Sequence, residues 1–226
     1  MLLKIAHRGA SAYEPENTLR AFQKAIELNA DMIELDVHLC KTGEVIVIHD
    51  PTLRRTTNGK GFIKKKTLAE IKSLHSLRNE PIPTLPETLD CINRRAKVNI
   101  EIKNKKAVIP VLKIIDEYVL GKGWEYEDFL ISSFLYPALQ HVRKLNTHLK
   151  VGILWNRVPL LWLKKVQAIH AYSLHLPHRK INAKLILKAH QQNIKVIAWT
   201  VNRPKNIAKM KELKVDGIIS NYPDKI

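Results

Sequence analysis

The chain has 226 residues, a length that suits one large domain or two small ones, and α/β barrels commonly reach this size as a single domain. Hydrophobic residues make up 45% and charged residues 26%, so intrinsic disorder is excluded as the main state. The apolar runs, such as 158–163, are far too short to cross a bilayer. The first residues lack the apolar core and cleavage site of a signal peptide, and we therefore expect a cytoplasmic protein. Cys40 and Cys91 fit neither a disulfide framework nor a C-x-x-C site.

The charge of the chain is unusual. There are 38 lysines and arginines against 21 aspartates and glutamates, which gives a formal net charge of +17. A field of this size attracts nucleic acid, anionic lipid or phosphorylated small molecules. The basic residues are scattered along the chain, with 64–66 as the longest block. This scatter favours a generally basic surface over a nucleic-acid footprint.

Short β-branched apolar runs alternate with amphipathic runs along the whole chain, a pattern typical of parallel strands joined by helices. We expect strands at 3–6, 32–37, 98–102, 129–133, 151–154, 171–176, 196–200 and 217–219. Helices are expected at 17–29, 86–96, 107–120, 136–146, 159–168, 182–192 and 204–213. Eight such strands favour an α/β fold of the closed (β/α)8 TIM barrel type. The alternative is an open doubly wound sheet, which would usually carry a G-x-G-x-x-G loop that this sequence lacks.

One apolar run, 45–48, follows the second strand with no room for a helix, so we interpret 37–49 as a β-hairpin that extends from that strand. If Thr42 and Gly43 form a two-residue loop, Asp36 lies opposite His49. The irregular basic segment that follows predicts a small insertion at about 50–85, on the barrel face where active sites form. Residues 1–226 are expected to form a single domain that includes this inserted subdomain.

Polar residues interrupt the apolar strands near their carboxyl ends, which a barrel gathers at one mouth. Glu34 and Asp36 alternate on the second strand, and Glu101 and Lys103 alternate on the third, so each pair shares a face. The other candidate site residues at such ends are His7, Arg8, His49 and Trp199.

The three carboxylates would repel one another strongly unless their charge is compensated. A hard divalent cation, Mg²⁺ or Ca²⁺, suits such ligands. The alternative is a set of buried salt bridges with Arg8 and Lys103. Both can hold if the cation and the two basic residues share one phosphate.

Two histidines at one rim, His7 and His49, suit general acid and base chemistry near neutral pH. Trp199 either belongs to the core or packs against the apolar part of a ligand. Four other histidines are expected to be surface or helix residues: His141, His148, His170 and His190.

At these positions the sequence resembles the glycerophosphodiester phosphodiesterase family over nearly its whole length. No single segment is decisive, but the ordered set is specific because each falls at a predicted strand end. The segments are H-R-G at 7–9, P-E-N-T at 15–18, I-E-L-D-V at 33–37, V-I-H-D-P-T-L at 47–53, R-T-T at 55–57, I-P-T-L at 82–85, I-E-I-K at 100–103, S-S-F at 132–134, W-T-V-N at 199–202 and D-G-I-I at 216–219.

The resemblance implies a barrel with an insertion after the second strand, and hydrolysis of glycerophosphodiesters to an alcohol and sn-glycerol 3-phosphate. It implies a divalent cation, Mg²⁺ or Ca²⁺, and a small-molecule substrate. From the scattered charge and the short apolar runs we expect neither nucleic acid as a partner nor stable membrane insertion. The residue roles it implies are metal ligands at Glu34, Asp36 and Glu101, acid and base at His7 and His49, phosphate contacts at Arg8 and Lys103, and a supporting position at Glu16. Similar enzymes first form a cyclic phosphate, and the sequence does not separate that route from direct attack by water.

The chain departs from the family pattern at a few positions. Ser220 and Asn221 stand where Thr-Asp is usual, a change that does not involve the proposed ligands. Three helix-to-strand turns that usually carry glycine have Asn29, Asn193 and Lys214 instead. We expect positive φ angles at the two asparagines, and at Lys214 with some strain.

Two other functions fit part of the sequence. A barrel without activity could bind nucleic acid or anionic membrane through its charge, but such a protein would have no need of the complete polar set. A phospholipase D-type enzyme acting on lysophospholipids would need apolar residues at the mouth. Leu160, Leu161 and Trp162 are candidates, and we expect them instead to form the core face of a helix. The preferred alcohol, the cation and the oligomeric state stay open.

Overall fold

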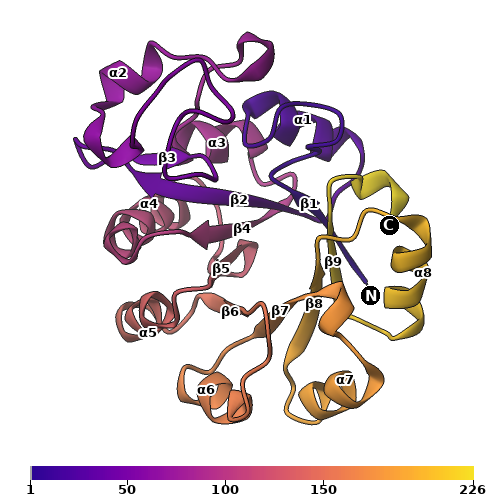
Figure 1. The fold of residues 1–226 in the computed structure, drawn as a ribbon. Helices are drawn as coiled ribbons and strands as arrows, with labels where there is room; N and C mark the ends of the chain where they lie inside the picture. Colours follow the sequence, from indigo (N-terminus) through magenta and orange to yellow (C-terminus); the bar gives the residue numbers. More distant parts are fainter. Residues whose placement is uncertain (1) are drawn as a thin grey trace.

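The computed structural model describes residues 2–226, which form a ring of strands surrounded by helices (Figure 1). The strands are β1 (Leu3–His7), β2 (Met32–Leu39), β3 (Val45–Val47), β4 (Lys97–Ile102), β5 (Phe129–Ser133), β6 (Lys150–Leu154), β7 (Ser173–Pro177), β8 (Lys195–Trp199) and β9 (Gly217–Ser220). The α-helices are α1 (Leu19–Glu27), α2 (Leu68–Lys72), α3 (Leu85–Ile92), α4 (Val108–Gly121), α5 (Tyr136–Leu145), α6 (Trp162–Ala168), α7 (Ala183–His190) and α8 (Pro204–Glu212). Short 3₁₀ helices are η1 (Ile63–Lys65), η2 (Leu77–Asn79), η3 (Lys105–Ala107), η4 (Tyr126–Asp128), η5 (His178–Lys180) and η6 (Pro223–Lys225).

The sheet closes on itself. Its order is β1-β9-β8-β7-β6-β5-β4-β2-β3, and β1 also pairs in parallel with β2. The eight parallel strands form the barrel, and β3 is an antiparallel addition to β2 outside it. The prediction of a (β/α)8 barrel is therefore confirmed, and the open sheet is excluded.

The apolar runs form strands because both of their faces are buried, one inside the barrel and one under the helices. Side chains such as Ile33, Leu35, Ile100 and Val196 are fully buried in this way. Several helices begin directly after a residue whose side chain caps the first free backbone amides. Thr84, for example, accepts a hydrogen bond from the backbone of Glu87 at the start of α3, as in a capping box.

The connection between β2 and β3 is longer by one residue than the sequence predicts. Val37 lies opposite Val47, and the loop holds three residues rather than Thr42 and Gly43 alone. The Gly43 amide donates to the Cys40 carbonyl at 3.2 Å, and Gly43 has a φ of 101°. This is a three-residue hairpin with glycine in the left-handed region.

The register of this hairpin corrects one prediction. The amide of Ile48 donates to the carbonyl of Asp36 at 2.9 Å, so Ile48 is the residue opposite Asp36. His49 follows one position later, where β3 has already ended. The predicted pairing of Asp36 with His49 is therefore wrong, although His49 still reaches the mouth of the barrel.

The segment between β3 and α3 packs its apolar side chains into a small cluster of their own. The members include Ile46, Leu53, Ile63, Ile71 and Ile82, all buried. In Figure 1 this segment, with α2, lies beyond β2 and β3, outside the ring of strands. At its start, His49 lines the cavity at the mouth of the barrel.

Three helix-to-strand turns without glycine have the positive φ angles that the sequence predicts. The φ angles are 54° at Asn29, 57° at Asn193 and 58° at Lys214. This prediction is confirmed. By contrast, only Trp162 of the trio 160–162 is buried, because α6 begins there. Leu160 is 96% and Leu161 59% exposed, so their predicted place in a helix core is wrong.

Candidate active site

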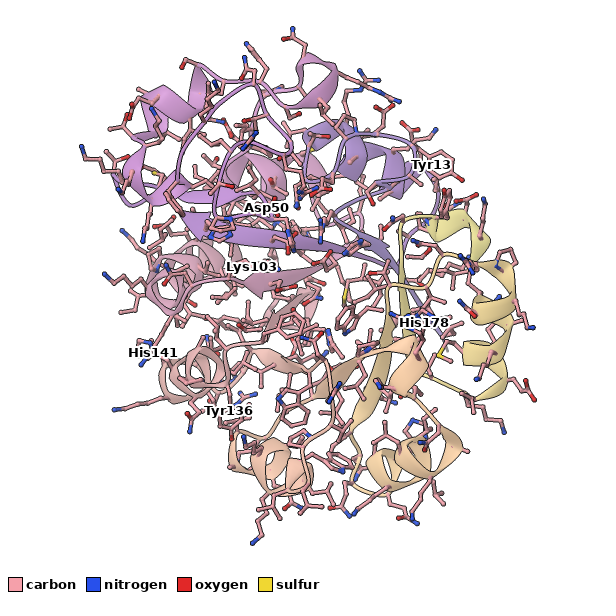
Figure 2. All side chains as sticks on the ribbon, viewed as in Figure 1. Tyr13, Asp50, Lys103, Tyr136, His141 and His178 are labelled. Carbon is pink, nitrogen blue, oxygen red and sulfur yellow. The ribbon has the colours of Figure 1, made fainter. Side chains whose placement is uncertain are left out.

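A cavity of about 210 Å³ opens at the carboxyl ends of the barrel strands. It collects residues from all eight barrel strands and from the end of the hairpin. The predicted site residues that line it are His7, Arg8, Glu34, His49, Glu101, Lys103 and Trp199. Asp36 lies beside them, fully buried. Lys103 and Asp50 are labelled over the strand ends in Figure 2.

Three carboxylates meet at one point of this cavity. Glu34, Asp36 and Glu101 each offer an oxygen atom, and these atoms all lie within 4.8 Å of one another. Asp36 and Glu101 are direct neighbours across β2 and β4, which explains the closeness. Burial raises the pKa of Glu34 well above its ordinary value, and the charge of Asp36 adds to this effect. Burial and Asp36 likewise raise the pKa of Glu101 to about 7.

Two basic side chains partly compensate these charges. Burial opposes ionisation of Asp36, but Lys103 and Arg8 together lower its pKa to about 2. The Nζ atom of Lys103 lies 2.9 Å from Oδ1 of Asp36 and also forms an ion pair with Glu101. Nε of Arg8 lies 3.3 Å from Oδ2 of Asp36. The buried salt bridges considered from the sequence are thus present.

These ion pairs leave negative charge uncompensated. Three carboxylates face two cationic side chains. Glu34 forms no ion pair with either of them and accepts only a hydrogen bond from the backbone amide of Arg8, at 2.8 Å. Burial is the main reason that the pKa values of Glu34 and Glu101 are raised, and the negative charge of Asp36 adds to it. All three ligand atoms are oxygens from adjacent strands, the donor type that Mg²⁺ and Ca²⁺ prefer. The residues therefore fit a hard divalent cation.

His7 is held by a residue at the far end of the chain. Its Nδ1 atom lies 2.7 Å from Oδ1 of Asn221, which can only accept, so Nδ1 carries the hydrogen. The other ring nitrogen, Nε2, has its lone pair free. Burial, with help from the charge of Arg8, lowers the pKa of His7 to about 4. His7 is therefore poised as a neutral imidazole.

His49 has the same arrangement with a different partner. Its Nδ1 lies 2.6 Å from Oδ1 of Asp50, which fixes the hydrogen on Nδ1. Its backbone carbonyl accepts from Nε2 of His38 at 3.0 Å, which anchors the end of the hairpin. Arg55, from the insertion, holds Asp50 in place, since its Nε donates to Oδ2 at 2.6 Å.

The same arginine joins this group to the first strand. Arg55 donates to both oxygens of Glu16, at 2.9 and 2.7 Å, and Glu16 also accepts from Arg8 at 2.8 Å. Burial opposes ionisation of Glu16, but Arg55 and Arg8 keep its pKa below the ordinary value. A continuous chain thus runs from His49, through its hydrogen bond to Asp50, and then through ion pairs that join Asp50, Arg55, Glu16 and Arg8.

The backbone around Arg8 is strained. Arg8 has a φ of 55° and Gly9 a φ of 78°, which points the Arg8 amide at Glu34. A Cβ atom at Gly9 would lie 2.6 Å from the backbone of Ala21, so only glycine fits. Non-glycine residues in the left-handed region often mark functional sites.

The rim and the floor of the cavity differ in character. At the rim, the rings of Phe134 and Trp199 meet edge to face with centroids 5.7 Å apart. At the floor, Asn99, Ser132 and His175 are buried and line the cavity. Both amide atoms of Asn99, Oγ of Ser132 and Nδ1 of His175 lack a hydrogen-bond partner within the described chain. Buried polar atoms are rarely left unpaired, so this floor is built for polar groups of a ligand or for water.

Known proteins match the chain along almost its whole length. The family model for the glycerophosphoryl diester phosphodiesterase family matches residues 7–225. A glycerophosphodiester phosphodiesterase from Caldanaerobacter subterraneus is 41% identical over 98% of this chain and 95% of its own length.

The chain belongs to this family. Its members are phosphoric diester hydrolases, and this chain is an enzyme of that class.

Two solved structures also resemble it. A phosphodiesterase from Oleispira antarctica, in complex with the product sn-glycerol-3-phosphate, has a TM-score of 0.92 at 29% identity and covers 98% of this chain and 94% of its own. A glycerophosphodiester phosphodiesterase from Thermotoga maritima has a TM-score of 0.84 at 30% identity, with 99% and 96% covered.

Several residues of the phosphodiesterase site have no role in our sequence-based assignment. Asn17 donates from Nδ2 to Oδ2 of Asp36 at 2.9 Å, and Asp50, Arg55 and Asn221 hold the two histidines. Asn17, Asp50 and Arg55 lie in segments that carry the family resemblance. The floor residue Asn99 alternates with Glu101 on one strand, which is a signal that the sequence does contain.

The other histidines and the cysteines behave largely as predicted. His141 and His190 lie on helices α5 and α7, and His148 and His170 are exposed in loops; His141 is labelled at the outside of the ring in Figure 2. Cys40 and Cys91 are free. No helix in residues 2–226 has both the length and the apolar character needed to cross a membrane.

Proposed function

We propose that this enzyme hydrolyses glycerophosphodiesters to an alcohol and sn-glycerol 3-phosphate, with one divalent cation and with His7 and His49 as acid and base. One observation carries the proposal: the two imidazoles line one cavity, and each has its Nδ1 hydrogen engaged by a partner. Each therefore presents Nε2, the atom that can take or give a proton.

The phosphodiester occupies the space between the carboxylates and the two imidazoles in this proposal. Arg8 and Lys103 neutralise its phosphate oxygens, because both cations line the cavity and are held by the buried carboxylates. Glu16 also holds the Arg8 guanidinium, with 2.8 Å between Nη1 and Oε1. Such fixed charges stabilise the negative charge that develops on the equatorial oxygens in the transition state.

A divalent cation held by Glu34, Asp36 and Glu101 supplies further positive charge for the phosphate oxygens. We propose Mg²⁺ or Ca²⁺, because carboxylate oxygens are hard ligands that suit either ion.

Two histidines are needed because two protons move. One histidine takes the proton of the attacking hydroxyl as the new P–O bond forms. The other starts as the imidazolium, protonated at both ring nitrogens, and gives its Nε2 proton to the alcohol oxygen as the old P–O bond breaks. The attacking group is either the 2-hydroxyl of the glycerol, which gives a cyclic phosphate that water then opens, or water itself. Both routes end in the same two products.

The walls of the cavity complete the substrate site. The unpaired polar atoms of Asn99, Ser132 and His175 suit the hydroxyl groups of glycerol. Phe134 and Trp199 line the cavity at the rim and offer apolar aromatic surface to its carbon atoms. In this assignment the glycerophosphoryl half lies in the barrel and the alcohol half lies toward the mouth.

Release of sn-glycerol 3-phosphate tests the function directly. Glycerophosphocholine, glycerophosphoethanolamine and a lysophospholipid are each supplied with Mg²⁺, with Ca²⁺ or with EDTA, and the product is measured enzymatically. We expect release with a divalent cation and none in EDTA. Absence of the product with every substrate and cation would refute the proposal and favour a barrel that only binds.

The same reaction, followed by a different method, separates the two routes. Phosphorus NMR of the reaction with glycerophosphocholine detects a cyclic glycerophosphate if the substrate hydroxyl attacks first. Direct attack by water gives no such signal at any time. The lysophospholipid arm tests the phospholipase D-type alternative, whose products are the free alcohol and a lysophosphatidate, so both are measured there by mass spectrometry. The exposed Leu160 and Leu161 are the observation that favours this alternative.

A further inference from the structure

The loops that follow β4 to β8 form one continuous part of the barrel mouth, and they contain no acidic residue. They span 103–107, 134–135, 155–161, 178–182 and 200–203. Lys103 and His178, which begin two of them, are labelled in Figure 2. We call this part of the mouth the basic rim. Its exposed cations are Lys105, Lys106, Arg157, Arg179, Lys180 and Arg203.

The opposite face of the barrel has a different charge. The loops that lead into the strands carry acidic residues at Asp31, Glu125, Glu127, Asp128 and Asp216. Several basic residues lie there too, so that face is mixed. The positive charge of the chain is therefore not uniform. It is concentrated in the loops after β4 to β8, which hold no counter-charge, whereas the loops after β1 and β3 at the same face carry Glu14, Glu16 and Asp50.

Helix stability does not explain this concentration. The helices α4 to α8 begin at the basic rim, and a helix N-terminus favours acidic residues because of its partial positive charge. The first turns of all five helices hold no acidic residue. Lysines stand near several of these starts instead, at Lys164, Lys184 and Lys205. The arrangement costs local stability and strengthens the positive field at the mouth.

The basic rim also exposes a group of large apolar side chains. Leu160 and Leu161 are 96% and 59% exposed, and Phe134 and Leu135 stand on the neighbouring loop. The two loops are adjacent around the mouth because β5 pairs with β6 (Figure 1). Single exposed leucines are common on soluble proteins, but adjacent apolar pairs on neighbouring loops beside a cavity mark an interaction surface.

We propose that the basic rim docks on anionic lipid bilayers, with Leu160 and Leu161 inserted among the acyl chains. Exposed apolar side chains surrounded by cations are the combination that binds the interface of an anionic membrane. Nucleic acid would match the charge but offers no apolar layer for the two leucines. Docking in this orientation turns the mouth of the cavity toward the membrane surface. The inference does not rest on the proposed chemistry.

Vesicle co-sedimentation tests the proposal on the full chain. The vesicles are phosphatidylcholine alone, or phosphatidylcholine mixed with phosphatidylglycerol. We expect binding to the mixed vesicles only. The double variant Leu160→Ser/Leu161→Ser should lower the partition coefficient at least about tenfold, and Arg179→Glu/Lys180→Glu should lower it by a similar factor. Salt at about 1 M should reduce binding of the wild type.

A matched control uses exposed leucines at the other end of the barrel. Leu120 is 86% and Leu145 52% exposed, and they lie near the C-terminal ends of α4 and α5. Leu120→Ser/Leu145→Ser should bind vesicles like the wild type. Every variant should keep its circular dichroism spectrum and its hydrolysis of glycerophosphocholine, since none of these residues lines the cavity.

Three results would overturn the proposal. One is equal loss of binding in the control and in the Leu160/Leu161 variant. Another is binding to neutral and anionic vesicles alike. The third is binding that survives the leucine changes, is lost in the charge variant, and is competed by a short DNA duplex, which would assign the rim to nucleic acid instead.

Discussion

The side chain of His7, at the end of the first strand, is held by Asn221, after the last strand, with 2.7 Å between Nδ1 and Oδ1. The family resemblance leads us to expect aspartate at position 221. The change from aspartate to asparagine at position 221 therefore leaves the three carboxylates unaffected, but it alters the hydrogen-bond partner of His7. An amide keeps the tautomer that an aspartate would keep, without its negative charge.

Position 221 gives the first prediction. Asn221→Leu removes the acceptor at nearly constant size, so His7 can turn or change its tautomer. We expect kcat for glycerophosphocholine to fall about tenfold to a hundredfold, with little change in KM. Asn221→Asp restores the acceptor and should retain most of the activity. Full kcat in a folded Asn221→Leu protein would remove the positioning role of Asn221.

The second prediction concerns His49. His49→Ala should fold normally, because the imidazole is about a third exposed and contributes little to the core. Loss of a positioned proton-transfer group should lower kcat by about 10²–10⁴-fold. KM and metal affinity should change much less. If His49 only braced the hairpin, stability would fall while the folded fraction kept its turnover, and His7 would then need another partner.

The carboxylates give a third prediction, which does not depend on turnover. A cation that binds only the folded state stabilises it, by about 2.7 kcal/mol when its concentration is a hundred times the dissociation constant. Mg²⁺ or Ca²⁺ should therefore raise the melting temperature of the wild type, and EDTA should reverse the rise. Glu34→Gln should abolish most of this shift, while Glu117→Gln on the surface of α4 leaves it unchanged. An equal shift in both variants would place the cation elsewhere.

The sequence predicts the barrel well because its signal is repeated. Every parallel strand is an apolar run buried on both faces, and each run lies between helical segments of ordinary length. The predicted pairing register of the hairpin is wrong by one residue, because that prediction depends on the length of a single turn. Thr42 and Gly43 fit a two-residue loop or the last part of a three-residue loop equally well. The structure has the three-residue loop, with Val45–Val47 of β3 buried.

The site is predictable for the same reason and to the same extent. Glu34, Asp36 and Glu101 can be found because strand alternation and the barrel topology bring them together. The chain of ion pairs through Asp50 and Arg55 cannot, because it joins irregular loops whose path follows no period. The exposure of Leu160 and Leu161 also escapes the sequence, since an apolar pair beside a helix normally belongs to its buried face.

A fourth prediction concerns pH and stability, away from the site. Asp216 accepts from the backbone of Val196 at 2.8 Å and pairs with His190 and Lys195. Burial opposes its ionisation, but these donors lower the pKa of Asp216 below the ordinary value. Because the pKa is lower in the folded state, the Asp216 carboxylate stabilises the fold at pH values above its unfolded-state pKa, which is about 3.9. This stabilisation is lost as the pH falls through the folded-state pKa.

Asp216→Asn measures that contribution. We expect the variant to be less stable than the wild type by about 1–2 kcal/mol at about pH 5, since charged hydrogen bonds are replaced by neutral ones. The difference should shrink as pH falls through the folded-state pKa of Asp216, because the wild-type carboxylate is then protonated as well. Urea unfolding across this range checks it. A difference that stays constant with pH would show that the charge of Asp216 does not matter.

The last prediction concerns Lys214, which turns the chain from α8 into β9 with a φ of 58°. A left-handed backbone costs a residue with a Cβ atom about 1–2 kcal/mol, and glycine avoids this cost. Glycine also gains more freedom in the unfolded chain, which offsets about 0.4–1 kcal/mol of the benefit. Lys214→Gly should therefore stabilise the protein by about 0.5–1 kcal/mol in urea unfolding. Lys209→Gly, inside α8, should destabilise it by about the same amount, because glycine is unfavourable in a helix. If both variants lost stability, the left-handed turn at Lys214 would carry no strain for glycine to relieve.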